Sequence, residues 1–80
     1  MENTKMYNEV FMQILDLKEN ELGGEIVFSE TMGWDSIGHM QLIAKLESEF
    51  DIFFDTEDIL NFSSFEHGKV ILKKYNIEIE

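Results

Sequence analysis

Apolar residues recur at helical spacing near the beginning of the chain. They form two neighbouring i, i+4 rows, Met6–Val10–Ile14 and Tyr7–Phe11–Leu15. Two such rows give a face wide enough to be buried, so the pattern predicts a helix over residues 4–17. Asn3 or Thr4 is its expected N-cap.

The helical spacing fails between residues 18 and 34, where Gly23, Gly24 and Gly33 mark a long connection. This connection still carries large apolar residues, namely Leu22, Ile26, Val27, Phe28 and Met32. A solvated loop has no need of them. We therefore expect the connection to pack across the helices.

A second helix is predicted to begin after Asp35, a favourable N-cap, and to end near Phe50. The residues expected to face inward are Ile37, Met40, Ile43, Ala44, Leu46 and Phe50.

Two shorter helices follow. One is predicted over residues 56–61, with Asp55 or Thr56 as cap and Ile59 and Leu60 as anchors. The other is predicted over residues 63–75, because Ser63 and Glu66 have the spacing of a capping box. Its inward residues are Phe65, Ile71 and Leu72. The fold class is therefore all-α, a four-helix bundle with a long first loop and a short third helix, in one domain over residues 1–80.

Composition narrows the function. Seventeen acidic residues against six basic ones give a net charge of -11, which disfavours nucleic acid and anionic membranes and favours partners with basic surfaces. The chain has no cysteine, so it supplies neither a disulfide nor a thiol. No apolar run is long enough to span a bilayer and no signal peptide is recognisable, so we expect a cytoplasmic monomer. The spacing of histidine and acidic residues predicts no metal site.

The main candidate for chemistry is Ser36. It follows Asp35 at the start of the second predicted helix, just after the Gly33 turn. Free backbone N–H groups and the helix dipole favour a phosphate ester at such a place. Taken alone, an Asp-Ser pair at a helix start is usually only a cap.

The wider pattern around Ser36 resembles the motif of acyl carrier proteins. The residues that carry the resemblance are Phe28, Met32-Gly33, Asp35-Ser36-Ile37, Leu42, Leu46 and Phe50. The resemblance covers nearly the whole chain. It implies that Ser36 carries a 4'-phosphopantetheine arm, that Asp35 and Ile37 assist recognition by the modifying transferase, and that the protein is a carrier and not an enzyme. It also implies that Phe54 packs in the core between the second and third helices, which leaves Phe53 as a partner contact or as a cover for the loop. Members of the family can enclose an acyl cavity in the bundle, and whether this chain has one depends on its packing.

Gly38 and Gln41 depart from the fatty-acid carriers, which usually have acidic residues there. Both resemble D-alanyl carriers, and Gln41 also resembles peptidyl carriers. The main expectation is an acyl carrier in fatty-acid-like or specialised lipid or polyketide biosynthesis. The alternatives are an aminoacyl or peptidyl carrier charged by an adenylating ligase, and an acidic adaptor that carries nothing. Gly38 itself either permits close approach by the arm or a partner, or is merely tolerated.

The partners implied by the resemblance are a phosphopantetheinyl transferase and an acyltransferase, synthase or adenylating ligase with a basic docking surface. The residues expected to contact them are Gly38, Met40, Gln41, Glu47, Phe53, Asp55 and Glu57. The expected acidic face comprises Glu30, Asp35, Glu47, Glu49, Asp51, Asp55, Glu57 and Asp58. Trp34 is expected either against the arm or packed in the loop. A catalytic role for His39 is disfavoured, because no group is identifiable to orient it.

Overall fold

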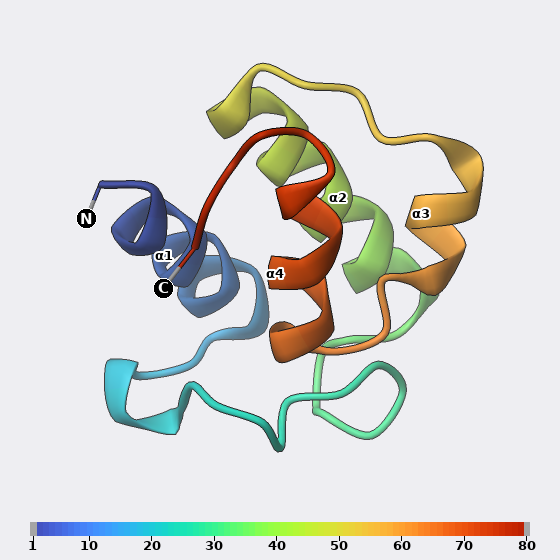
Figure 1. Ribbon diagram of the computed structural model, residues 1–80. Helices are drawn as coiled ribbons and strands as arrows, with labels where there is room; N and C mark the ends of the chain where they lie inside the picture. The colour runs from blue at the N-terminus through green and yellow to red at the C-terminus, as the bar shows by residue number, and fades with distance from the viewer. Residues whose placement is uncertain (1, 80) are drawn as a thin grey trace.

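The computed structural model describes residues 2–79 and contains four α-helices. These are α1 (Glu2–Leu15), α2 (Ser36–Phe50), α3 (Thr56–Asn61) and α4 (Phe65–Lys73), with a 3₁₀ turn, η1 (Glu19–Glu21), in the first connection (Figure 1). The described residues contain no regular strand. The predicted all-α fold, with its long first connection and short third helix, is confirmed.

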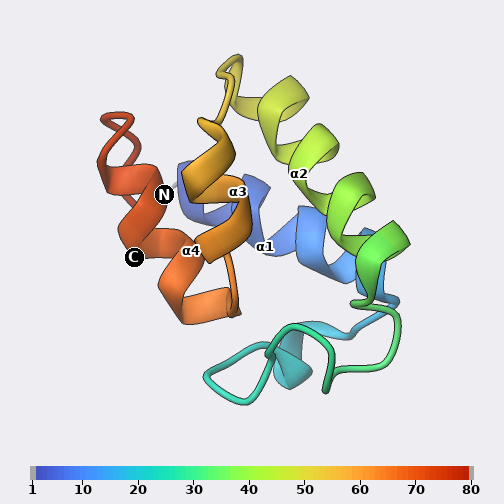
Figure 2. The ribbon, with the colours of Figure 1, turned by 90° about the vertical axis from the view of Figure 1, so that its right-hand side faces the viewer.

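The long first connection closes one end of the bundle, as both ribbon views show (Figures 1 and 2). It is tied to the segment between α3 and α4 by two backbone hydrogen bonds. Phe28 N–H donates to the Ser63 carbonyl (2.9 Å), and Phe65 N–H donates to the Ile26 carbonyl (2.9 Å). These bonds flank an isolated antiparallel bridge between Val27 and Ser64. The connection therefore belongs to the packed structure.

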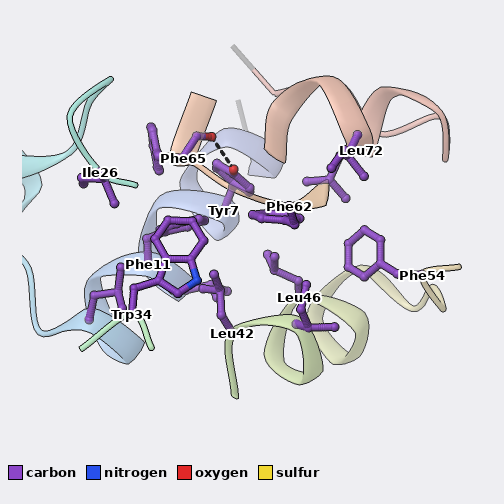
Figure 3. Close-up of a cluster of buried hydrophobic side chains, with 14 of the residues drawn as sticks. Tyr7, Phe11, Ile26, Trp34, Leu42, Leu46, Phe54, Phe62, Phe65 and Leu72 are labelled. Atoms are coloured by element: carbon purple, nitrogen blue, oxygen red, sulfur yellow. Dashed lines mark hydrogen bonds between the residues drawn. The ribbon is translucent and has the colours of Figure 1, made fainter. Parts of the chain in front are cut away.

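Aromatic side chains form the centre of the core (Figure 3). The Phe11 ring lies 4.9 Å from Tyr7, 4.9 Å from Phe65 and 5.4 Å from Trp34, measured between ring centroids. The Tyr7 hydroxyl donates to the Phe65 carbonyl at 2.6 Å. Burial, with a smaller contribution from the charge of Glu66, raises the pKa of Tyr7 well above its ordinary value. Tyr7 is therefore a neutral donor that ties α1 to α4.

The first connection contributes to this core, but not with every residue expected. Ile26 is buried, and Leu22 and Phe28 pack against the core from partly buried positions. Met32 is 91% exposed, so the expectation that it packs inward is wrong. Trp34, two residues later, fills the interior at this end of α2.

Two predicted helix caps are wrong. Asn3 and Thr4 lie inside α1, which already includes Glu2. The cap of α4 is Ser64, whose hydroxyl oxygen accepts from His67 N–H at 2.9 Å. Ser63 cannot serve because the bridge to the first connection uses its carbonyl and places it outside the helix.

The inward face of α2 also differs from the prediction. Ile37, Met40 and Ala44 are exposed, whereas Leu42, Ile43 and Leu46 are buried with Gly38. The helix carries apolar residues on two neighbouring stripes, and only one of them faces α1. Leu60 on α3 is likewise 78% exposed, so it does not anchor that helix.

Helix α3 is held by the buried carboxylate of Asp58, which pairs with two side chains that follow α4. Asp58 is 3% exposed and accepts from Lys74 Nζ at 2.7 Å and from the Tyr75 hydroxyl at 2.6 Å. The hydrogen bond from Lys74, and then that from Tyr75, lowers the pKa of Asp58 below its ordinary value. Asp58 is therefore a structural residue, and its expected place on the acidic docking face is wrong.

We predict that Asp58→Asn destabilises the protein at neutral pH and that the difference from wild type disappears in acid. The folded-state pKa of Asp58 is lowered from 3.8. The stability it contributes is therefore present above that value and is lost as the pH falls through the folded-state pKa. Urea unfolding of both proteins between pH 7 and about pH 2 measures the difference. Glu57→Gln, on the exposed face of the same helix, controls for the loss of one charge, and an equal effect of the two variants would refute the prediction.

Candidate functional site

Ser36 is the first residue of α2, and its side chain is exposed. Among residues 2–79 its hydroxyl has no hydrogen-bond partner. The cap is supplied by Asp35, whose carboxylate accepts from Gly38 N–H at 2.9 Å. The remaining backbone N–H groups of the first turn and the positive end of the helix dipole lie beside the serine. A free hydroxyl thus stands where a phosphate ester would be stabilised.

Trp34 fixes the approach of the chain to this serine. Its side chain is 0% exposed, so its placement in the packed loop, one of the two expected, is the one observed. Its backbone N–H donates to the Thr31 carbonyl (3.0 Å), and its carbonyl accepts from Ser29 N–H (2.8 Å). Its indole N–H donates to His39 Nδ1 at 2.9 Å. All polar groups of Trp34 are therefore hydrogen-bonded, and this holds the backbone two residues before Ser36.

His39 connects this loop to α3. Because the indole N–H can only donate, His39 Nδ1 accepts, and in the neutral ring Nε2 carries the proton. Nε2 lies 2.8 Å from the Ile59 carbonyl and donates to it. We call this pair of hydrogen bonds, Trp34–His39 and His39–Ile59, the His39 bridge. Both ring nitrogens are engaged, so His39 has a structural role here and no free nitrogen to act as a base.

Gly38 is required by the packing of the first turn. It is buried, and a Cβ atom at this position would overlap the carbonyl oxygen of Gly33. Gly33 itself has a φ of 91°, which places its carbonyl against the helix. The close approach is therefore made by the protein's own loop. It involves neither an arm nor a partner, and it is not mere tolerance in a frayed turn.

Several of the residues expected to contact partners do lie on the surface, Ile37, Met40 and Gln41 in the first turns of α2 and Phe53, Asp55 and Glu57 between its far end and the start of α3. Ile37 is 72% exposed, Met40 60% and Phe53 87%, and Gln41, Asp55 and Glu57 are also exposed. Glu47 is only half-buried, and its carboxylate accepts from Phe54 N–H at 2.9 Å, which holds the α2–α3 loop. Phe54 is buried, as expected.

Sequence reasoning missed the His39 bridge and the role of Asp58. The sequence held one signal for the contact between Trp34 and His39, because the two residues are only five positions apart across a predicted helix start. The second partner of His39, Ile59, is 20 residues away and contributes only a backbone carbonyl, so no residue type marks it. Within the described part of the chain, no group of three histidine or acidic side chains is arranged to hold a metal ion.

Comparison with known proteins agrees with this geometry. Residues 9–67 match the family described as "Phosphopantetheine attachment site". The chain is 26% identical over 70 residues to the acyl carrier protein of Buchnera aphidicola subsp. Acyrthosiphon pisum, in strains Tuc7 and APS, and the match covers 88% of each chain. No solved structure gave a significant match. No helix in the described residues is long and apolar enough to cross a membrane.

We predict that Gly38→Ala destabilises the protein by about 1–3 kcal/mol. The new methyl group meets a backbone carbonyl, which cannot rotate away as a side chain can. Alanine is the better helix former by roughly 0.5–1 kcal/mol, so an unhindered site would show a gain. Gly23→Ala is the matched control, since its Cβ would meet nothing within 4 Å. Urea unfolding measures both, and a Gly38→Ala protein as stable as wild type would contradict the packing role.

Proposed function

Because this chain belongs to the phosphopantetheine-attachment family and is a carrier of the acyl-carrier type, we propose that it holds an acyl group as a thioester on an arm attached to Ser36. The observation that carries the proposal is the free, exposed hydroxyl of Ser36 beside a helix start that Asp35 already caps. The match of residues 9–67 to the family includes this position.

The residues around Ser36 fit a phosphopantetheine group. Phosphopantetheine supplies the thiol that this cysteine-free chain lacks. In the attachment step, the Ser36 oxygen forms a bond to the β-phosphorus of coenzyme A, and the hydroxyl proton passes to a base of the transferase. The bond to the α-phosphate oxygen breaks, and adenosine 3',5'-bisphosphate leaves. The first-turn N–H groups would stabilise the resulting phosphodiester, and Asp35 and Ile37 would present the serine.

Among the cargo classes, we propose acyl groups of a fatty-acid-like or specialised lipid or polyketide pathway. Gly38 was one of two features that favoured an aminoacyl carrier, and its packing against Gly33 now accounts for it. Gln41 is then the one feature that still favours an aminoacyl carrier. A non-carrier adaptor has no need of an uncommitted serine hydroxyl at a helix start. Charging of the primed protein from malonyl-coenzyme A, compared with an amino acid and an adenylating ligase, separates the two carriers.

We also propose that the docking surface has two parts. Exposed Ile37 and Met40 form a small apolar part next to Ser36, with neutral Gln41 beside them. Asp55 and Glu57, at the start of α3, contribute an acidic part together with the exposed ring of Phe53. Such a surface fits partner enzymes with a basic rim around an apolar contact.

Incubation with coenzyme A and a broad-specificity phosphopantetheinyl transferase should add the mass of one phosphopantetheinyl group. The addition should be absent in Ser36→Ala, because the alanine has no nucleophilic oxygen. Intact-protein mass spectrometry measures it. Ser48→Ala, an exposed serine on the same helix, is the control and should be modified like wild type. Failure of wild type to gain mass would refute the proposed function.

Binding to the transferase should weaken by about threefold to tenfold between 50 mM and 500 mM salt, because exposed charges are screened. The double variant Asp55→Asn/Glu57→Gln should bind more weakly at low salt and show a flatter salt dependence. Glu2→Gln/Glu9→Gln on α1 removes the same charge elsewhere and should behave like wild type. Affinity that is independent of salt, or equal effects of the two double variants, would contradict the acidic part of the docking surface.

A further inference from the structure

A small apolar pocket lies close to Ser36, between α2 and α3. It has a volume of about 150 Å³ and is lined by Phe28, His39, Ile59, Leu60, Phe62 and Ser63. His39 lies three residues after Ser36, which is about one turn along α2. The exposed side chain of Leu60 stands at the rim. An arm attached at Ser36 therefore starts about one helical turn from an apolar surface that could receive the group it carries.

The pocket does not continue into the core. His39 lines it, whereas Trp34, whose indole N–H is hydrogen-bonded to Nδ1 of the same ring, is 0% exposed and does not line it. The two rings lie nearly parallel, at 21° and with centroids 6.1 Å apart. Phe62, another wall of the pocket, is 1% exposed and packs on both Trp34 and Phe54. Figure 3 shows Trp34 and Phe62 as part of the same packed cluster as Leu42 and Leu46.

The His39 bridge makes this floor rigid. The imidazole is held at both nitrogens, at 2.9 Å from the indole nitrogen and 2.8 Å from the Ile59 carbonyl oxygen. Swinging the ring aside to admit a longer group would leave a buried indole N–H and a backbone carbonyl without partners, which is costly. Asp58, next to Ile59, also ties α3 to Lys74 and Tyr75, so a shift of α3 away from α2 would break these interactions as well.

We propose that His39 sets the length of acyl group that this protein can shelter. The inference rests on the proposed attachment at Ser36. A cavity of about 150 Å³ holds a group of about six carbons. Acyl chains up to that length enter the pocket, and the part of any longer chain beyond it stays in solvent. His39 is thus a specificity-determining residue for cargo, and the carrier suits short acyl groups.

The test loads acetyl, hexanoyl and octanoyl groups onto Ser36 from the corresponding acyl-coenzyme A with a broad-specificity transferase. Intact mass confirms each product. The readouts are the melting temperature and the half-life of the thioester toward hydroxylamine. In wild type, both should rise from acetyl to hexanoyl and show no further rise with octanoyl. In His39→Ala, the half-life should rise again by at least about threefold from hexanoyl to octanoyl, since each further buried methylene favours the sheltered state by about that factor.

His67→Ala is the matched control, because His67 is exposed on α4 and should leave the wild-type plateau unchanged. The wild-type series decides the matter even if His39→Ala does not fold. Protection that keeps rising through octanoyl in wild type, or that does not change between acetyl and hexanoyl, would overturn the length limit while leaving attachment intact. Absence of any mass gain would instead overturn the attachment itself, and with it this inference.

Discussion

Burial of the Trp34 indole is the constraint on which the site depends. The ring occupies the junction of the first connection, α1 and α2, where it contacts Phe11, Phe28 and Phe62. Its backbone and indole groups are all hydrogen-bonded, so the chain reaches Asp35 in one orientation. Ser36 follows two positions later, at the start of the capped helix, and is exposed. The packing of Trp34 thus fixes the backbone from which Ser36 is presented.

The same constraint explains the composition of the first turn of α2. The loop that brings Trp34 inward must pass close to the helix, and only a glycine at position 38 leaves room for the Gly33 carbonyl. Burying one apolar stripe of α2 leaves the other stripe, with Ile37 and Met40, in solvent. The fold therefore places an exposed apolar surface beside the serine without any separate element to present it. The arrangement that packs Trp34 in the core therefore also leaves Ser36 and the apolar surface beside it in solvent.

The sequence predicted those features that local chemistry specifies. The bounds of α3, the Asp35 cap of α2 and the serine motif all follow from residue types within a few positions of one another. The inward face of α2 did not follow, because the helix offers two apolar stripes and the choice depends on where α1 lies. Asp58 could not be separated from its acidic neighbours, since its partners Lys74 and Tyr75 come from another helix end. The cap of α4 was predicted one residue too early, at Ser63, because the bridge that leaves this role to Ser64 joins segments far apart in the sequence.

Trp34 is also the single tryptophan of the chain. Its ring is sealed from solvent, is hydrogen-bonded to an imidazole and lies two residues from the serine. The tryptophan fluorescence of the protein therefore comes from one place, and that place adjoins both the attachment position and the wall of the pocket. The molecule contains its own optical probe of the region where cargo and partner enzymes would meet, and no label has to be introduced there.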